Sequence, residues 1–181
     1  MQPEQAMLSS RVSGILRCAL AGAAACFLPL LQQPAQAETG TATVQSLEIR
    51  VELRSSAPPA GAVVLHNAGA LELRVWRMAN SWGDQTLSLE LKADGSPQSV
   101  TLKPQYYTLN GPIYVPLAPG QDYRIEFNLG DRRRWEPDLW HDSAPAAGSE
   151  LIAVYRSERS PESDKNGVWT GFIRSVPVKL N

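Results

Sequence analysis

Apolar and polar residues alternate along much of the chain after residue 46, which is the pattern of β-strands. The segment "SLEIRVELR" shows this best, with apolar side chains at every second position, Leu47, Ile49, Val51 and Leu53. A period of two places one face of such a segment in a core and the other in water. Similar alternation predicts further strands at 86–92 and 122–129.

Turn-forming residues separate these strands. Pro58 and Pro59 interrupt the chain after the first strand, since proline cannot donate to a strand ladder. The segment "NAGA" follows a short strand at 63–66 and precedes another at 71–75. Asn67 and Gly69 tolerate positive φ, so "NAGA" is predicted to close a hairpin between those two strands.

The second half of the chain predicts an edge strand, two further strands and long polar connections. Residues 103–117 are irregular and end in a short edge strand, whereas "LIAVYR" at 151–156 has the composition of a buried strand. The stretch 157–167 reads as a solvated loop, and 168–180 as a last strand with a bulge at Gly171. No apolar stripe of helical period is present. About eight or nine short strands favour an antiparallel sandwich over a parallel sheet, with a closed barrel as the alternative.

A resemblance supports this architecture. The segments "LAPGQDYRIEFNL", "GSELIAVYR" and "GVWTGFIRSVPVKL" occur in that order between residues 117 and 180, separated by polar loops. This order resembles the last three strands of immunoglobulin-like or fibronectin-like modules of bacterial secreted proteins. The resemblance implies an all-β, antiparallel immunoglobulin-like β-sandwich and carries no active site, because that fold hosts many roles. The mature chain lacks the Cys-Trp-Cys core of antibody-type domains.

The first 37 residues have the features of a bacterial secretory signal peptide. A basic start and an apolar, alanine-rich middle are followed by Ala35-Gln36-Ala37, which predicts cleavage after Ala37. Arg17 and Pro29 interrupt the apolar run, so a membrane span is disfavoured. A lipoprotein anchored at Cys26 is the alternative, but Ala23 stands where lipoproteins carry leucine. The expected mature chain, 38–181, is one periplasmic or secreted domain without a membrane span.

Charge and cysteine content narrow the function classes. The whole chain has a formal net charge of −1 and stays slightly acidic once residues 1–37 are removed. No global basic field therefore indicates nucleic acid. Cys18 and Cys26 both lie in the removed segment, so the mature chain has no disulfide, thiol nucleophile or thiolate metal site.

Catalytic motifs are sparse, and we expect neither an enzyme nor a cofactor. His66 is interpreted as a strand-end residue bonded to a neighbouring loop. His141 lies in an acidic segment that could hold a metal ion and support a metal-assisted hydrolase, with the candidate ligands Glu136, Asp138, His141 and Asp142. That spacing matches no metal-binding motif, no G-x-S-x-G is present, and a solvated loop explains the segment equally well.

Aromatic side chains in loops are the better candidates for a site. Trp169 is predicted to pack in or over the core, and Trp76 is predicted to cover an edge of the sandwich. The candidate binding residues are Trp82, Arg134, Trp135 and Trp140. Aromatic rings beside arginine can stack on a sugar or fill a pocket in a protein partner. The alternative is that these rings fold inward and close one end of the sandwich.

The expected function is therefore a non-catalytic secreted or periplasmic protein that binds a protein or glycan partner in the cell envelope through its loops. A protease inhibitor that presents the loop 157–167 is a further alternative. The segment "RMANSWGDQT" at 77–86 is interpreted as a corner between two strands that Trp82 closes. Gly83 is expected to supply unusual backbone dihedrals there, and the burial of Trp82 distinguishes a corner from a binding surface.

Overall fold

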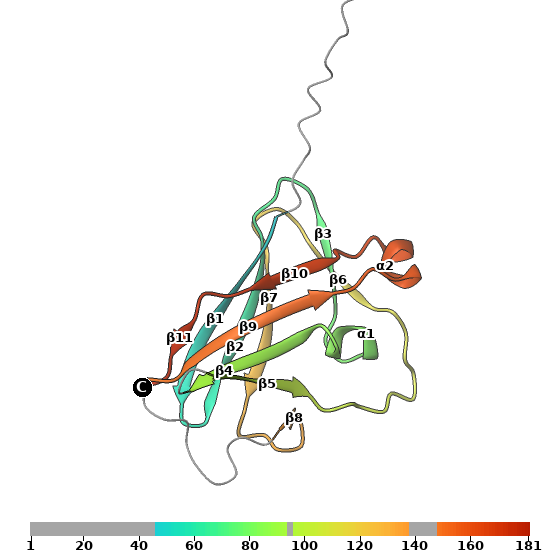
Figure 1. The fold of residues 1–181 in the computed structure, drawn as a ribbon. Helices are drawn as coiled ribbons and strands as arrows, with labels where there is room; N and C mark the ends of the chain where they lie inside the picture. Colours follow the sequence, from blue (N-terminus) through green and yellow to red (C-terminus); the bar gives the residue numbers. More distant parts are fainter. Residues whose placement is uncertain (1–45, 94–95, 138–147) are drawn as a thin grey trace, which may run out of the picture. The chain divides into compact units, whose positions relative to one another are not determined.

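The computed structural model describes residues 46–93, 96–137 and 148–181. This part of the chain is all-β, with antiparallel strand pairs throughout and two short helices (Figure 1). The strands form a three-stranded sheet, a six-stranded sheet and a two-stranded sheet. The all-β prediction is confirmed.

The three-stranded sheet has the order β1-β2-β7. Its strands are β1 (Leu47–Ser56), β2 (Pro59–Asn67) and β7 (Asp122–Asn128). In β7 and in the first four residues of β1, buried or partly buried residues alternate with exposed ones, as the sequence predicted. The connection between β1 and β2 is tight, since Ser56 pairs with Pro59. Proline is tolerated there because it is the first residue of its strand.

The six-stranded sheet has the order β10-β9-β4-β5-β8, and β11 also pairs with β9. Its strands are β4 (Leu87–Ala93), β5 (Ser96–Leu102), β8 (Trp135–Glu136), β9 (Glu150–Ser157), β10 (Gly171–Arg174) and β11 (Val178–Lys179). The single last strand predicted at 168–180 is divided in two. At the break, the Ser175 hydroxyl accepts the N–H of Ala153 at 2.9 Å, so a side chain replaces a carbonyl of the ladder.

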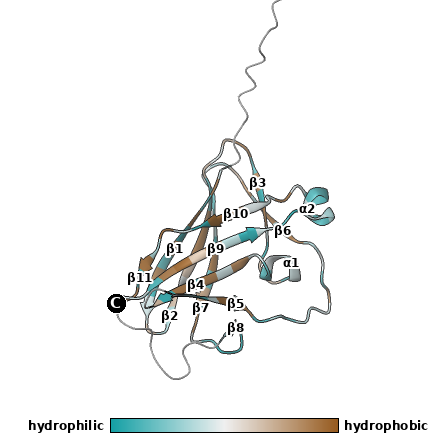
Figure 2. Cartoon of the chain, viewed as in Figure 1, coloured by the Kyte–Doolittle hydropathy of each residue, from teal (hydrophilic) through white to brown (hydrophobic). Residues whose placement is uncertain are grey.

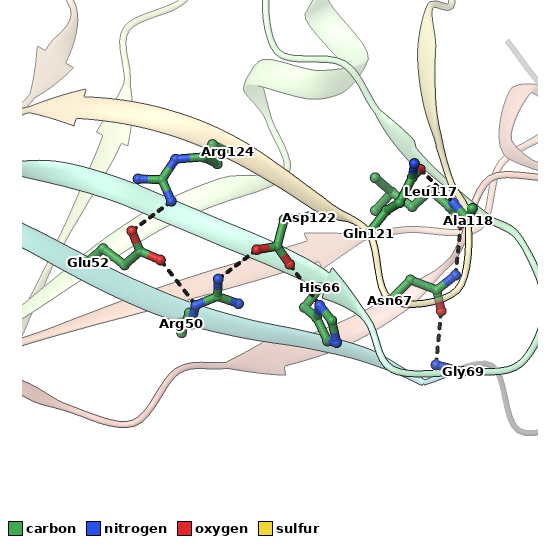
Figure 3. A network of polar contacts seen from close by, with 10 residues as sticks. All are labelled: Arg50, Glu52, His66, Asn67, Gly69, Leu117, Ala118, Gln121, Asp122 and Arg124. Carbon is green, nitrogen blue, oxygen red and sulfur yellow. Dashed lines mark hydrogen bonds and ion pairs between the residues drawn. The ribbon is translucent and has the colours of Figure 1, made fainter.

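The two-stranded sheet joins β3 (Leu73–Trp76) to β6 (Tyr114–Leu117). The predicted hairpin between β2 and β3 is therefore wrong. Neither Asn67 nor Gly69 has positive φ. Asn67 is instead fully buried, and its side-chain amide donates to the carbonyl of Leu117 at 2.8 Å (Figure 3) and to that of Leu71, also at 2.8 Å. These bonds direct the chain from β2 to β3, beside β6.

All three sheets contribute to one hydrophobic cluster. Fully buried members include Val63 of β2, Val75 of β3 and Leu89 of β4, together with Leu151 and Tyr155 of β9. Figure 2 shows hydrophobic residues on β4 and β9 and mainly hydrophilic ones on α2. Burial of such side chains is the main favourable contribution to folding.

The outer face of the three-stranded sheet carries a lattice of opposite charges (Figure 3). Arg50 donates to Asp122 and Arg124 donates to Glu52, each at 2.7 Å. Arg50 also reaches Glu52 at 3.2 Å. The Nδ1 atom of His66 lies 2.7 Å from Asp122, so the interpretation of His66 as a hydrogen-bonded strand-end residue is confirmed, with a strand rather than a loop as its partner.

These charged side chains also cover an apolar strip on the central strand. Val64 lies in register between Arg50 and Arg124, and Ala62 lies between Glu52 and Glu126. Both small apolar residues share the outer face with the charges, yet they are 0% and 1% exposed. The aliphatic stems of long charged side chains can shield apolar surface in this way.

The lattice predicts a loss of stability in acid. The hydrogen bond from Arg50 holds the pKa of Asp122 below its ordinary value of 3.8. The hydrogen bond from Arg124 likewise holds the pKa of Glu52 below its ordinary value of 4.5. A carboxyl group whose pKa is lower in the folded protein than in the unfolded chain stabilises the fold at pH values above its ordinary pKa. This stabilisation is lost as the pH falls through the pKa of the folded state. The melting temperature should therefore drop between about pH 5 and about pH 3, and less so in an Arg50→Gln variant. Equal acid sensitivity in that variant and the wild type would contradict this prediction.

The two helices are α1 (Ser81–Asp84) and α2 (Pro161–Asn166). Neither was expected, because each is too short to show an apolar stripe. Across the described ranges, no helix has both the length and the apolar content needed to cross a membrane.

Candidate functional site

The corner at 77–86 is built around α1. The Asn80 side chain caps the helix by accepting the N–H of Gly83 at 2.8 Å, and its amide donates to the Ile113 carbonyl at 3.2 Å. At the other end, the Thr86 hydroxyl donates to the Gly83 carbonyl at 2.6 Å. Asn80 and Thr86 are both buried. These bonds fix the corner before β4 begins, so its side chains are held on a defined scaffold.

Gly83 is needed for space rather than for its dihedral angles. A Cβ at this position would lie 1.9 Å from the Arg77 carbonyl oxygen, which is a backbone atom that cannot move aside. The expected unusual dihedrals are not found at Gly83, whereas Ala79 has a φ of 85°. The earlier expectation for Gly83 is therefore wrong in its reason, although glycine is still required.

Trp82 is half-buried, so it is neither a fully buried plug nor a free surface ring. Its ring lies against Trp76, with 6.1 Å between centroids and 34° between planes. Trp76 is 3% exposed and anchors the pair to the core. A supported, partly exposed aromatic ring loses little conformational freedom when a ligand stacks on it.

The segment 157–167 forms the opposite wall of the site, and the loop predicted there is wrong. Ser160 caps α2 in a reciprocal pair with Ser163, Pro161 begins the helix, and Gly167 ends it with a φ of 62°. Arg74 of β3 donates to the Asn166 carbonyl at 3.0 Å. Six residues of the segment that the protease-inhibitor alternative would present are therefore helical.

A pocket of about 460 Å³ lies between α1, the end of β9 and the start of α2. We call it the Trp82 pocket. Its wall combines the Trp82 ring with hydrogen-bonding groups, among them Gln85, Thr86, Ser157, Arg159 and Glu162. Its volume is within the range of small-molecule sites.

Ser157 is an unusual wall residue. It is 3% exposed, and its hydroxyl has no hydrogen-bond partner in the described part of the chain. Its hydroxyl oxygen has less than 1 Å² of accessible surface, so a ligand in the pocket reaches it only if the wall rearranges. On the rim, Arg156 pairs with Glu158 at 3.1 Å and Arg159 with Asp164 at 3.0 Å.

Trp135 is not the exposed platform that the sequence suggested. It lies in β8 opposite Leu102, is 2% exposed and belongs to the hydrophobic cluster. The alternative that this ring folds inward is correct, because the pairing of β8 with β5 turns it toward the core. Trp140 lies outside the described residues. Trp169 packs on the core as expected, with its ring 6.0 Å from that of Tyr155.

Arg134 is exposed and lines a separate hollow of about 420 Å³, which we call the arginine hollow. Arg133, Asp131, Asp84 and Tyr107 share its wall. The Tyr107 hydroxyl donates to Asp84, and burial together with this hydrogen bond raises the pKa of Tyr107 to about 12. Tyr107 stays protonated at neutral pH, and its hydroxyl ties the loop that follows β5 to α1.

The suggested metal ligands are only partly described. Glu136 is exposed in β8, while Asp138, His141 and Asp142 lie outside the described residues. Elsewhere in 46–93, 96–137 and 148–181, no group of three or more histidine, cysteine, aspartate or glutamate side chains is placed to hold a metal ion.

Of the predicted binding residues, the structure places Trp82 and Arg134 in different hollows and removes Trp135 from the surface. Sequence reasoning missed Gln85, Ser157 and Arg159, which reach the Trp82 pocket from two distant segments. The signature Ser160-Pro161 with Gly167 was available as a helix signal and would have placed the second wall. Comparisons of the chain with family models, curated proteins and solved structures gave no match.

Proposed function

We propose that this protein is a non-catalytic binding module whose Trp82 pocket holds a sugar unit of an envelope glycan. The observation that carries the proposal is the half-exposed, Trp76-supported Trp82 ring in the wall of a pocket whose other lining side chains are polar or charged. A sugar ring presents an apolar C–H face and several hydroxyls. Its apolar face matches the indole, and its hydroxyls match the surrounding donors and acceptors.

A glycan fits this wall better than a peptide does. Apart from Trp76 and Trp82, the lining side chains are polar or charged, including Gln85, Thr86 and Ser160. A peptide anchored by apolar side chains would need an apolar subsite of the kind found at interface hot spots. Arg156 and Arg159 of the pocket wall are engaged in ion pairs with Glu158 and Asp164, so we assign them a role in orienting the wall.

The fold is proposed to be of the immunoglobulin or fibronectin type. The order β1-β2-β7 corresponds to strands A-B-E, and the order β10-β9-β4-β5 corresponds to G-F-C-C′. On this assignment, β3 and β6 are additions that pair with each other. They carry Trp76 to the Trp82 pocket, so the addition to the common sandwich builds the site.

The location is proposed to be the periplasm or the extracellular medium, with residues 1–37 removed. The support is the basic, apolar and A-x-A order of that segment. Expression of the full chain in a bacterial host and sequencing of the exported protein should give Glu38 as the first residue. Retention of residues 1–37 in the folded product would contradict this part of the proposal.

The binding proposal is tested by titrating a glycan array that spans neutral, N-acetylated and acidic sugars. We expect capture of a glycan by the wild type and a loss of roughly tenfold or more for Trp82→Ala, since an aromatic contact is removed. Gln85→Ala should also weaken capture while leaving the fold as stable, because Gln85 is an exposed polar residue of the pocket wall.

Tyr106→Ala is the matched control, since Tyr106 is 94% exposed in the loop that follows β5 and lines none of the hollows described here. It should bind like the wild type. Thermal unfolding of each variant separates lost binding from lost folding. A wild type that captures no glycan, or a folded Trp82→Ala variant that binds normally, would refute the proposal.

A further inference from the structure

The Trp82 pocket is one end of a longer surface. A middle hollow of about 420 Å³ shares Gln85, Thr86 and Arg156 with the Trp82 pocket. The same middle hollow shares Asp84 and Tyr107 with the arginine hollow. The three hollows thus follow one another around α1, each joined to the next by common wall residues.

The middle hollow differs in character from the two ends. Leu87, Leu102 and Pro104 line it, so its wall is more apolar than that of the Trp82 pocket. Tyr107 stands at its junction with the arginine hollow and is fixed there by its hydrogen bond to Asp84. A pre-formed path of this kind suits an extended ligand, because little of the wall must be ordered on binding.

The arginine hollow offers unused donors. Within the described residues, the guanidinium groups of Arg133 and Arg134 have no hydrogen-bond or ion-pair partner. Two carboxylates, Asp84 and Asp131, line the same hollow and already accept hydrogen bonds from other groups of the protein. Asp84 accepts from the Ala79 N–H and the Tyr107 hydroxyl, and Asp131 accepts from the Arg133 N–H.

We infer that the three hollows form one groove for a linear acidic oligosaccharide. One sugar unit stacks on Trp82, the chain crosses the middle hollow, and a carboxylate of a later unit is held by Arg133 and Arg134. Guanidinium groups bind carboxylates through paired N–H donors, which gives such a site both strength and direction. This inference rests on the proposed function, because it extends the ligand of the Trp82 pocket.

The test is a calorimetric titration of the mature protein with uronic-acid oligomers, using the dimer and the hexamer, and with a neutral glucose hexamer. The wild type should bind the uronate hexamer roughly tenfold or more tightly than either the dimer or the neutral hexamer. The double variant Arg133→Gln/Arg134→Gln should bind the hexamer only as tightly as the wild type binds the dimer. Lys179→Gln, an exposed charge on β11, is the control and should change nothing.

The two proposals fail in different ways. In one outcome, the wild type binds dimer and hexamer equally, the arginine double variant behaves like the wild type, and Trp82→Ala abolishes binding. The groove is then wrong, and the single Trp82 pocket stands. If Trp82→Ala retains full binding of every oligomer, the proposed function itself is wrong. Equal affinity for hexaglutamate and the uronate hexamer would show that charge alone is recognised, and it would overturn the assignment to a saccharide.

Discussion

Replacing Trp135 with alanine is expected to lower the free energy of unfolding by about 3–5 kcal/mol. The ring is 2% exposed in the hydrophobic cluster, and its removal leaves a cavity beside Leu102 that β8 is too short to close. Urea denaturation followed by far-ultraviolet circular dichroism measures the change. A large part of a small domain's total stability would be lost, so the variant should be partly unfolded at 37 °C.

The matched control is Tyr106→Ala, because Tyr106 is also a large aromatic residue but is 94% exposed, in the loop that follows β5. Its effect should stay within about 0.5 kcal/mol. If Trp135→Ala loses less than about 1 kcal/mol, the burial of this ring is refuted and its role as an exposed binding residue returns.

Replacing Asn67 with alanine is expected to lower the free energy of unfolding by about 3–5 kcal/mol, as the sum of several lost hydrogen bonds. Its amide donates to the carbonyls of Leu71 and Leu117, and its side-chain oxygen accepts the N–H of Gly69 at 3.0 Å. The two carbonyls and the N–H group would each lose this partner. Asn67 is fully buried, so water does not readily replace its side chain. Chemical denaturation gives the value.

Asn128→Ala is the control for this variant. Asn128 is exposed, and its side chain accepts a single backbone N–H, that of Gly130, at 2.9 Å. Its loss should cost about 1 kcal/mol or less. Equal effects of the two substitutions would mean that the buried amide does not hold β3 in place beside β6.

The strands were predictable wherever one face is buried and the other is solvated. In β1, β4 and β7 the alternation of apolar residues follows from that asymmetry, and sequence alone located all three. The pairing of β3 with β6 was not predictable, because the two segments are far apart in the chain and Asn67 resembles a turn residue in sequence. Only its burial reveals that its side chain bonds to two separate strands.

The helices show a different limit. The segment α1 spans only Ser81–Asp84, so no periodicity can reveal it. For α2 the information was present, since Ser160, Pro161 and Gly167 are an N-cap, a first-turn residue and a C-terminal residue. A highly polar composition concealed that signal.

Composition could not show which tryptophan side chains are buried in the core and which are partly exposed. Trp135 and Arg134 are adjacent in sequence, but β8 directs the first into the core and leaves the second at the surface. Successive side chains of a strand point to opposite faces, so Trp135 is buried while Glu136, the other residue of β8, is exposed. Trp82 was recognised as a candidate, but its partners in the pocket come from β9 and α2, which no local pattern connects to it.

The central claim is that the Trp82 pocket binds a saccharide. The most direct measurement is a two-dimensional ¹H–¹⁵N NMR titration of the mature protein with the uronate hexamer, recording the amide signals and the indole N–H of Trp82. The account predicts that the largest shifts occur at Trp82, Gln85 and Ser157, while residues on the outer face of the β1-β2-β7 sheet do not move. Shifts confined to that outer face, or no shifts at saturating oligosaccharide, would contradict it.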